Sequence, residues 1–95
     1  MAVSRAERRA ARRDRVVAVF GEHRAEAALD LLEITEFAWH DCYDEITPSE
    51  NFVDEMLLCS GGDLSTLIEV ARLAVTDWRD VKLWAQAIHD QADGG

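Results

Sequence analysis

His40 is the side chain in this sequence best placed to do chemistry. On a helix, Glu36 lies one turn before it and Asp44 one turn after it, with Asp41 adjacent. Two carboxylates and an imidazole on one helix face could hold a divalent metal ion. The Glu-x-x-His spacing of di-iron bundles is missing, however, because Phe37 stands three residues before His40. We therefore favour an exposed histidine over a metal site at Glu36, His40 and Asp44, and we expect no cofactor.

A basic arm begins the chain. Only Glu7 and Asp14 are acidic in its first fifteen positions, whereas 17 of the 19 acidic residues follow later with only four basic ones. Arginines four residues apart repel on a helix, so the first turns should fray unless acidic groups hold them. Three interpretations stay open: a solvated tail, docking onto an acidic surface of this or another chain, or contact with nucleic-acid phosphates. The arm residues predicted to contact a partner are Arg5, Arg8, Arg9, Arg12 and Arg13.

An acidic stripe follows the helical segment beyond the arm. Its members besides Glu36 are Glu26, Asp30, Glu33, Asp41 and Asp44. The stripe is either a solvated face or a docking surface for a basic partner, of which the arm is the nearest. Phe37 lies within the stripe and is either covered by another element or an interface anchor. Trp84, at the edge of a later apolar seam, is a second candidate for a subunit interface.

Capping signals and apolar periodicity predict helices and no strand. Ser4, Thr47 and Asp63 are the expected N-caps of three of these helices. Whether Gly21 and Asp77 break the helices around them is left open. The predicted helical segments cover about residues 4–20, 22–44, 48–60 and 64–88.

The last segment carries the strongest periodicity in the chain. Spacings of three and four alternate without a polar interruption, which is typical of a long helix packed lengthwise against another. Its seam residues are Leu64, Leu67, Ala71, Ala74, Trp78, Val81, Ala85 and Ile88. The sequence predicts a small all-α bundle with two long antiparallel helices, a short connecting helix and a basic N-terminal helical arm. We expect the arm to cover residues 1–15 and one helical domain to cover residues 16–95.

Several protein classes are disfavoured by what the sequence lacks. It holds no Gly-rich phosphate loop, nucleophile elbow, His-Glu-x-x-His or Cys-x-x-Cys motif, so we expect no enzyme. No apolar run approaches the roughly 20 residues of a membrane span. Cys42 and Cys59 both fall in helical apolar patterns, which predicts buried free thiols and a cytoplasmic location.

Three short segments carry a family resemblance. Trp39-His40-Asp41-Cys42-Tyr43, then Thr47-Pro48, and later Asp77-Trp78-Arg79-Asp80 resemble small uncharacterised helical proteins of high-GC, actinobacterial-type bacteria. The resemblance covers about residues 25–90. It implies a bacterial source and a helical class, but no activity, cofactor or site residue.

The leading functional hypothesis is a helical protein–protein interaction or assembly module that forms a homodimer. A single pair of long helices leaves apolar flanks, which a second copy of the chain commonly covers. The alternative is a nucleic-acid-associated regulator that uses the arginine arm. A metal-binding protein is the third hypothesis.

Overall fold

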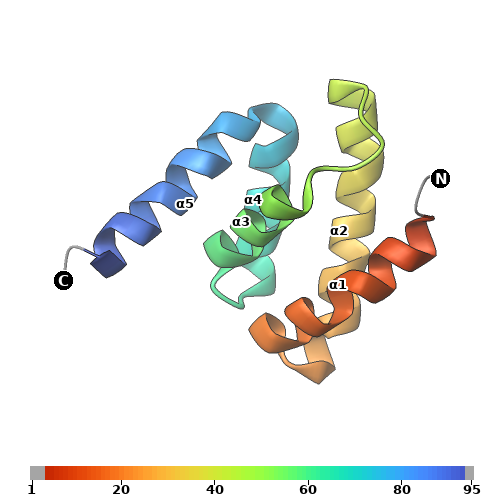
Figure 1. The fold of residues 1–95 in the computed structure, drawn as a ribbon, viewed down its shortest axis with the longest axis horizontal. Coiled ribbons are helices and arrows are strands. Elements are labelled where there is room, and N and C mark those ends of the chain that lie inside the picture. Colours follow the sequence, from red (N-terminus) through yellow and green to blue (C-terminus); the bar gives the residue numbers. More distant parts are fainter. Residues whose placement is uncertain (1–3, 94–95) are drawn as a thin grey trace.

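The computed structural model describes residues 4–93, and within them the chain is all-helical, as predicted (Figure 1). Gly21 separates the first two helices: its φ of 82° ends one, and its N–H still donates to the Val17 carbonyl oxygen at 2.8 Å. None of the helices in this part of the chain has the length and apolarity that crossing a membrane requires. The helices are α1 (Arg5–Phe20), α2 (Glu22–Tyr43), α3 (Glu50–Ser60), α4 (Leu64–Thr76) and α5 (Trp78–Asp93).

Side-chain caps begin three of the helices. Ser4 and Glu7 form the predicted capping box of α1, and Asp63 accepts a hydrogen bond from the Thr66 backbone N–H (3.0 Å) at the start of α4. The predicted cap of α3 is wrong by two residues. Ser49 caps α3 by accepting from the backbone N–H of Phe52 at 3.1 Å, which leaves the Thr47 hydroxyl free for other contacts.

The structure answers the question left open at Asp77, where the predicted segment 64–88 is divided into α4 and α5. This residue leaves the helical conformation, with φ −156° and ψ 103°, and its carboxylate accepts a hydrogen bond from the Arg79 backbone N–H at 3.1 Å. A short acidic side chain competes with the helix in this way by bonding nearby backbone groups. Trp78 therefore begins α5 with 36% of its surface exposed, although the seam had placed it in the core.

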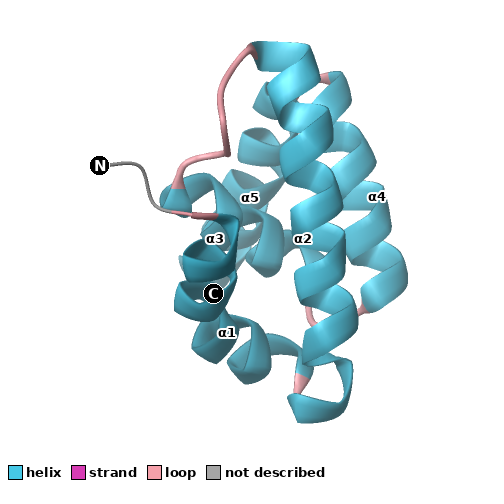
Figure 2. Cartoon of the chain, turned by 90° about the vertical axis from the view of Figure 1, so that its right-hand side faces the viewer, coloured by secondary structure: helices cyan, strands magenta, loops and turns pink. Residues whose placement is uncertain are grey.

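α2 and α4, the pair that the sequence predicted to be antiparallel, pack side by side (Figure 2) but run in the same direction (Figure 1), so that part of the prediction is wrong. At their carboxyl ends the Tyr43 hydroxyl donates to the Ala74 carbonyl oxygen at 2.8 Å. At the opposite ends Gly62, just before α4, lies against the Val19 carbonyl, just before α2. The directions match because α3 carries the chain back before α4 begins.

The core draws on all five helices. Trp39 lies in it, as predicted, with its ring centroid 4.4 Å from that of Tyr43 and 4.9 Å from that of Phe52. Cys59 is buried, but Cys42 is exposed, contrary to the prediction for both thiols. At the end of α2 it is Tyr43 that faces α4, so the adjacent Cys42 points elsewhere. The largest fully buried side chains are Leu29, Met56, Leu67, Val16, Val53, Val70 and Val81.

Candidate functional site

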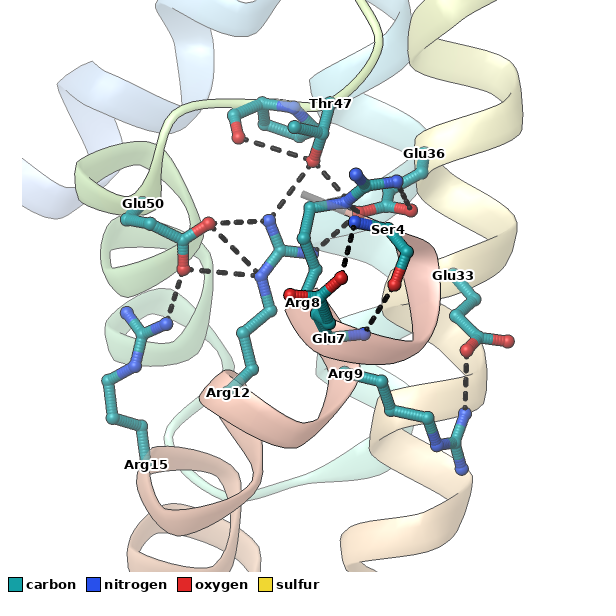
Figure 3. A network of polar contacts seen from close by, with 11 residues as sticks. Ser4, Glu7, Arg8, Arg9, Arg12, Arg15, Glu33, Glu36, Thr47 and Glu50 are labelled. Atoms are coloured by element: carbon teal, nitrogen blue, oxygen red, sulfur yellow. Dashed lines mark hydrogen bonds and ion pairs between the residues drawn. The ribbon is translucent and has the colours of Figure 1, made fainter. Parts of the chain in front are cut away.

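Residues 5–15 of the basic arm belong to α1, which lies against acidic residues of α2 and α3 (Figures 1 and 3). Residues 1–3 of the predicted arm lie outside the described part of the chain. The boundary predicted after residue 15 falls inside this helix. The ion pairs of the arginines in α1 agree with one of the three interpretations of the arm, namely docking onto the chain's own carboxylates. We call the innermost group the arginine clamp, which consists of Arg8, Arg12, Glu36, Thr47 and Glu50.

Arg12 lies at the centre of the clamp, between α2 and α3 (Figure 3). One of its terminal nitrogens donates to Glu36 at 2.8 Å, and the other donates to Thr47 Oγ1 at 3.0 Å and to Glu50 at 2.7 Å. Only 3% of the Arg12 side chain and 4% of the Glu36 side chain are exposed. A planar guanidinium suits this position because it presents several donors in fixed directions.

Glu36 is fully engaged by its neighbours. Arg8 donates to both carboxylate oxygens, at 2.8 and 3.2 Å, and the Thr47 hydroxyl donates at 2.9 Å. Burial acts to raise the pKa of Glu36, but hydrogen bonds from Arg8 and Thr47 and the charge of Arg12 lower it overall. The hydrogen bond to Glu36 raises the pKa of Arg8. The clamp therefore ties α1, α2 and the segment before α3 together.

The outer arginines make more exposed ion pairs. Arg9 contacts Glu26 at 2.6 Å and Asp30 at 2.8 Å. Arg13 also pairs with Glu26, while Arg15 reaches across to α3. The repulsion expected between neighbouring arginines is thus offset by carboxylates that alternate with them across the α1–α2 hairpin. The carboxylates that pair with the arm are Glu26, Asp30, Glu33, Glu36, Glu50 and Asp54.

Acid is expected to destabilise the fold through Glu50. Hydrogen bonds from Arg12 and Arg15 lower the pKa of Glu50 to about 2, from its ordinary value of 4.5. Because the pKa is lower in the folded state, the resulting stabilisation is complete above about pH 4.5 and is lost as the pH falls toward 2. Urea unfolding followed by circular dichroism at pH 7, 4 and 2.5 measures this loss. Glu50→Gln should show a shallower dependence over the same range, and an unchanged slope would contradict the assignment.

The three candidate metal ligands, Glu36, His40 and Asp44, do not surround a common point. Glu36 is held by the clamp, whereas His40 and Asp44 are exposed, and Asp44 ends α2 with a left-handed φ of 58°. Across residues 4–93 no group of three or more His, Cys, Asp or Glu side chains is arranged to hold a metal ion. Glu36 and His40 line one hollow, but Asp44 does not line it, so the three side chains do not form a common ligand set.

Two apolar side chains stand out beside the clamp. Phe37 is 53% exposed, and the Arg5 guanidinium carbon lies 4.1 Å above the centre of its ring. Ile46 is 62% exposed. α2 ends at Tyr43, so Ile46 projects from the segment that follows this helix.

Ile46 lines two hollows beside the clamp. The larger has a volume of about 620 Å³ and is mostly apolar, and the smaller has a volume of about 360 Å³. The larger is lined by Arg8, Ala11, Arg15, Glu45, Ile46, Thr47, Pro48, Ser49 and Glu50. The smaller is lined by Arg5, Arg8, Glu36, Phe37, His40, Asp41 and Ile46. We call these lining residues together the Phe37–Ile46 face.

Trp84, the other predicted interface residue, lies away from this face. It is half-buried on α5 and packs against the core, so only part of its ring is available to a partner. A third hollow of about 190 Å³ forms beside Trp39, Phe52 and Trp78. The exposure of Ile46 and the position of this hollow both depend on where α2 and α4 end, at Tyr43 and Thr76.

No protein-family model matches the chain, and neither a curated protein nor a solved structure matches it significantly. The functional assignment therefore rests on the geometry of residues 4–93.

Proposed function

We propose that the chain is a helical protein–protein interaction module that binds its partner through the Phe37–Ile46 face. The observation that carries the proposal is the pair of exposed apolar side chains, Phe37 and Ile46, bordering two adjoining hollows. Recognition sites commonly combine an apolar concavity with a few convergent polar groups. We propose binding, and not catalysis, as the role of this face.

Rigidity supports the choice of this face. Thr47, next to Ile46, accepts a hydrogen bond from Arg12 and donates one to Glu36, so the clamp anchors the segment that carries Ile46 at this residue. A partner then meets a preformed surface and loses less conformational entropy on binding. Leu83 on α5 is as exposed as Ile46, yet it lines none of the three hollows.

The nucleic-acid alternative gains little from the structure. Five arginines of α1 face six carboxylates, so this region presents no surplus of positive charge to phosphates. Arg5 is the arginine of the arm that makes no ion pair within residues 4–93, and it lies over Phe37. Phosphate binding would have to break pairs that already satisfy the other arginines.

Selection of random 12-residue peptides displayed on phage tests the proposed face. Wild-type protein should enrich peptides that the Phe37→Ala/Ile46→Ala variant does not retain, because both apolar contacts are removed. The double variant should stay folded by circular dichroism, since both side chains are mostly exposed. Leu83→Ala is the matched control and should retain the peptides. Equal retention by the double variant would overturn the proposal.

A further inference from the structure

We propose that the Phe37–Ile46 face receives a basic segment of another protein, which inserts one large apolar side chain into the larger hollow. This inference rests on the proposed function and specifies the partner's chemistry. The charged side chains around the two hollows that form no ion pair, together with the size of the larger hollow, indicate the chemistry of this partner.

Four charged side chains around the hollows are already neutralised. Arg8 pairs with Glu36, and Arg15 pairs with Glu50, in contacts that also involve Arg12. Arg8, Glu36 and Glu50 belong to the clamp, and Arg15 pairs with it through Glu50, so a partner gains little by opposing these four charges. The charge that a partner meets is therefore set by the other residues that line the hollows.

The unengaged charge is predominantly negative. Asp41 and Glu45 are exposed, and neither forms an ion pair with any described residue; Asp44, between them in the chain, is likewise exposed and unpaired. Arg5 is the single opposing charge, and the Phe37 ring already contacts it. Lysine or arginine side chains of a partner would find carboxylates here at the rim of an apolar hollow.

The larger hollow suits one anchoring side chain. Ala11, Ile46 and Pro48 contribute apolar surface to it, and its volume of about 620 Å³ lies in the range of small binding pockets. A leucine, methionine or phenylalanine side chain occupies part of such a space, and neighbouring residues of the segment that carries it occupy the rest. The apolar anchor brings most of the affinity, while rim charges select the partner. The partner is thus an apolar anchor flanked by basic residues.

A second copy of this chain fits the face less well. Each copy carries a net charge of −9 and would present the same unengaged carboxylates to its twin. Repulsion between like-charged surfaces opposes association unless specific contacts offset it. The homodimer predicted from the sequence is therefore the competing occupant, and the experiment distinguishes it.

The selected phage peptides provide the test. Peptides retained by wild type and lost by Phe37→Ala/Ile46→Ala should carry a net positive charge around an aromatic or long aliphatic residue. In fluorescence-polarisation titrations at 50 mM salt, the most enriched peptide should bind Asp41→Asn/Glu45→Gln about fivefold more weakly than wild type. Glu69→Gln/Asp80→Asn, which neutralises two exposed carboxylates outside the hollows, is the matched control and should bind like wild type.

Three results would overturn the inference. The basic partner is refuted if the peptides that require Phe37 and Ile46 are neutral or acidic. It is also refuted if the peptide binds Asp41→Asn/Glu45→Gln as tightly as wild type. Neither result would contradict the proposed face. A dimer seen by light scattering that Phe37→Ala/Ile46→Ala converts to monomer would assign the face to a second copy. Failure of the proposed function itself gives a different result, because the Phe37→Ala/Ile46→Ala variant would then retain the selected peptides as well as wild type does.

Discussion

Arg12→Ala is expected to lower the free energy of unfolding by about 3 kcal/mol, at the low end of the range for breaking a buried ion pair. Removing the guanidinium takes the 2.8 Å contact with Arg12 from buried Glu36 and removes every Arg12 hydrogen bond to Glu50 and Thr47. The low end applies because Arg8 still donates to Glu36 and Arg15 still pairs with Glu50. For a domain of this size the loss is a large fraction of the total stability.

Urea denaturation followed by circular dichroism measures this effect against a control on the same helix. Arg13→Ala removes an arginine that pairs only with exposed Glu26, so its loss should be much smaller. Arg12→Lys should recover part of the loss, because an ammonium carries the charge but cannot make the forked contacts. If Arg12→Ala and Arg13→Ala are equally mild, the clamp does not hold α1 in place.

Gly62→Ala is expected to destabilise the protein by roughly 3 kcal/mol, from two separate costs. Gly62 has a φ of 80°, a left-handed conformation that is unfavourable by about 1–2 kcal/mol for other residues. A Cβ at this position would also lie 2.7 Å from the Val19 carbonyl oxygen, and that oxygen belongs to the backbone at the end of α1. Relief would require the turn before α4 to move away from α1, which adds a further packing cost.

The neighbouring glycine separates these two costs. Gly61 also has a positive φ, of 59°, but a Cβ there meets no atom within 4 Å. Gly61→Ala should therefore lose only about 1 kcal/mol, from its backbone conformation alone. Thermal unfolding monitored by circular dichroism compares the two variants directly. Equal melting temperatures would mean that the contact between Gly62 and Val19 is not close in solution.

The helical class and most helix starts could be predicted because they depend on residues within about one turn of each other. Ser4 and Asp63 cap their helices through backbone groups three residues away, so these contacts can be predicted from residue types and spacing alone. The break at Asp77 and the choice of Ser49 over Thr47 were harder to predict. At Asp77 a short acidic side chain competes with the helix for nearby backbone groups. Before α3, two hydroxyl side chains two residues apart could each act as the cap, and Ser49 does so.

The distribution of charge along the chain was also evident from the sequence, but the pairing of those charges in the folded protein was not. The arm and the stripe could be identified as opposite charges, whereas Arg12 reaches Glu36 and Glu50 across 24 and 38 residues. Whether such groups meet depends on how α1 folds back at Gly21 and where α3 lies. Local periodicity carries no information about either. The same holds for Ile46, whose exposure follows from the end of α2 at Tyr43.

By itself, then, the sequence determined an all-helical chain, most helix boundaries, and a basic helix followed by acidic ones, since propensity, capping and net charge are properties of neighbouring residues. Tertiary structure alone decided that the arginines are neutralised by the chain's own carboxylates, that α2 and α4 run in the same direction, and that Phe37 and Ile46 share one face. The reason is physical: these features arise from contacts between residues far apart in the chain, whose geometry is set by the packing of whole helices.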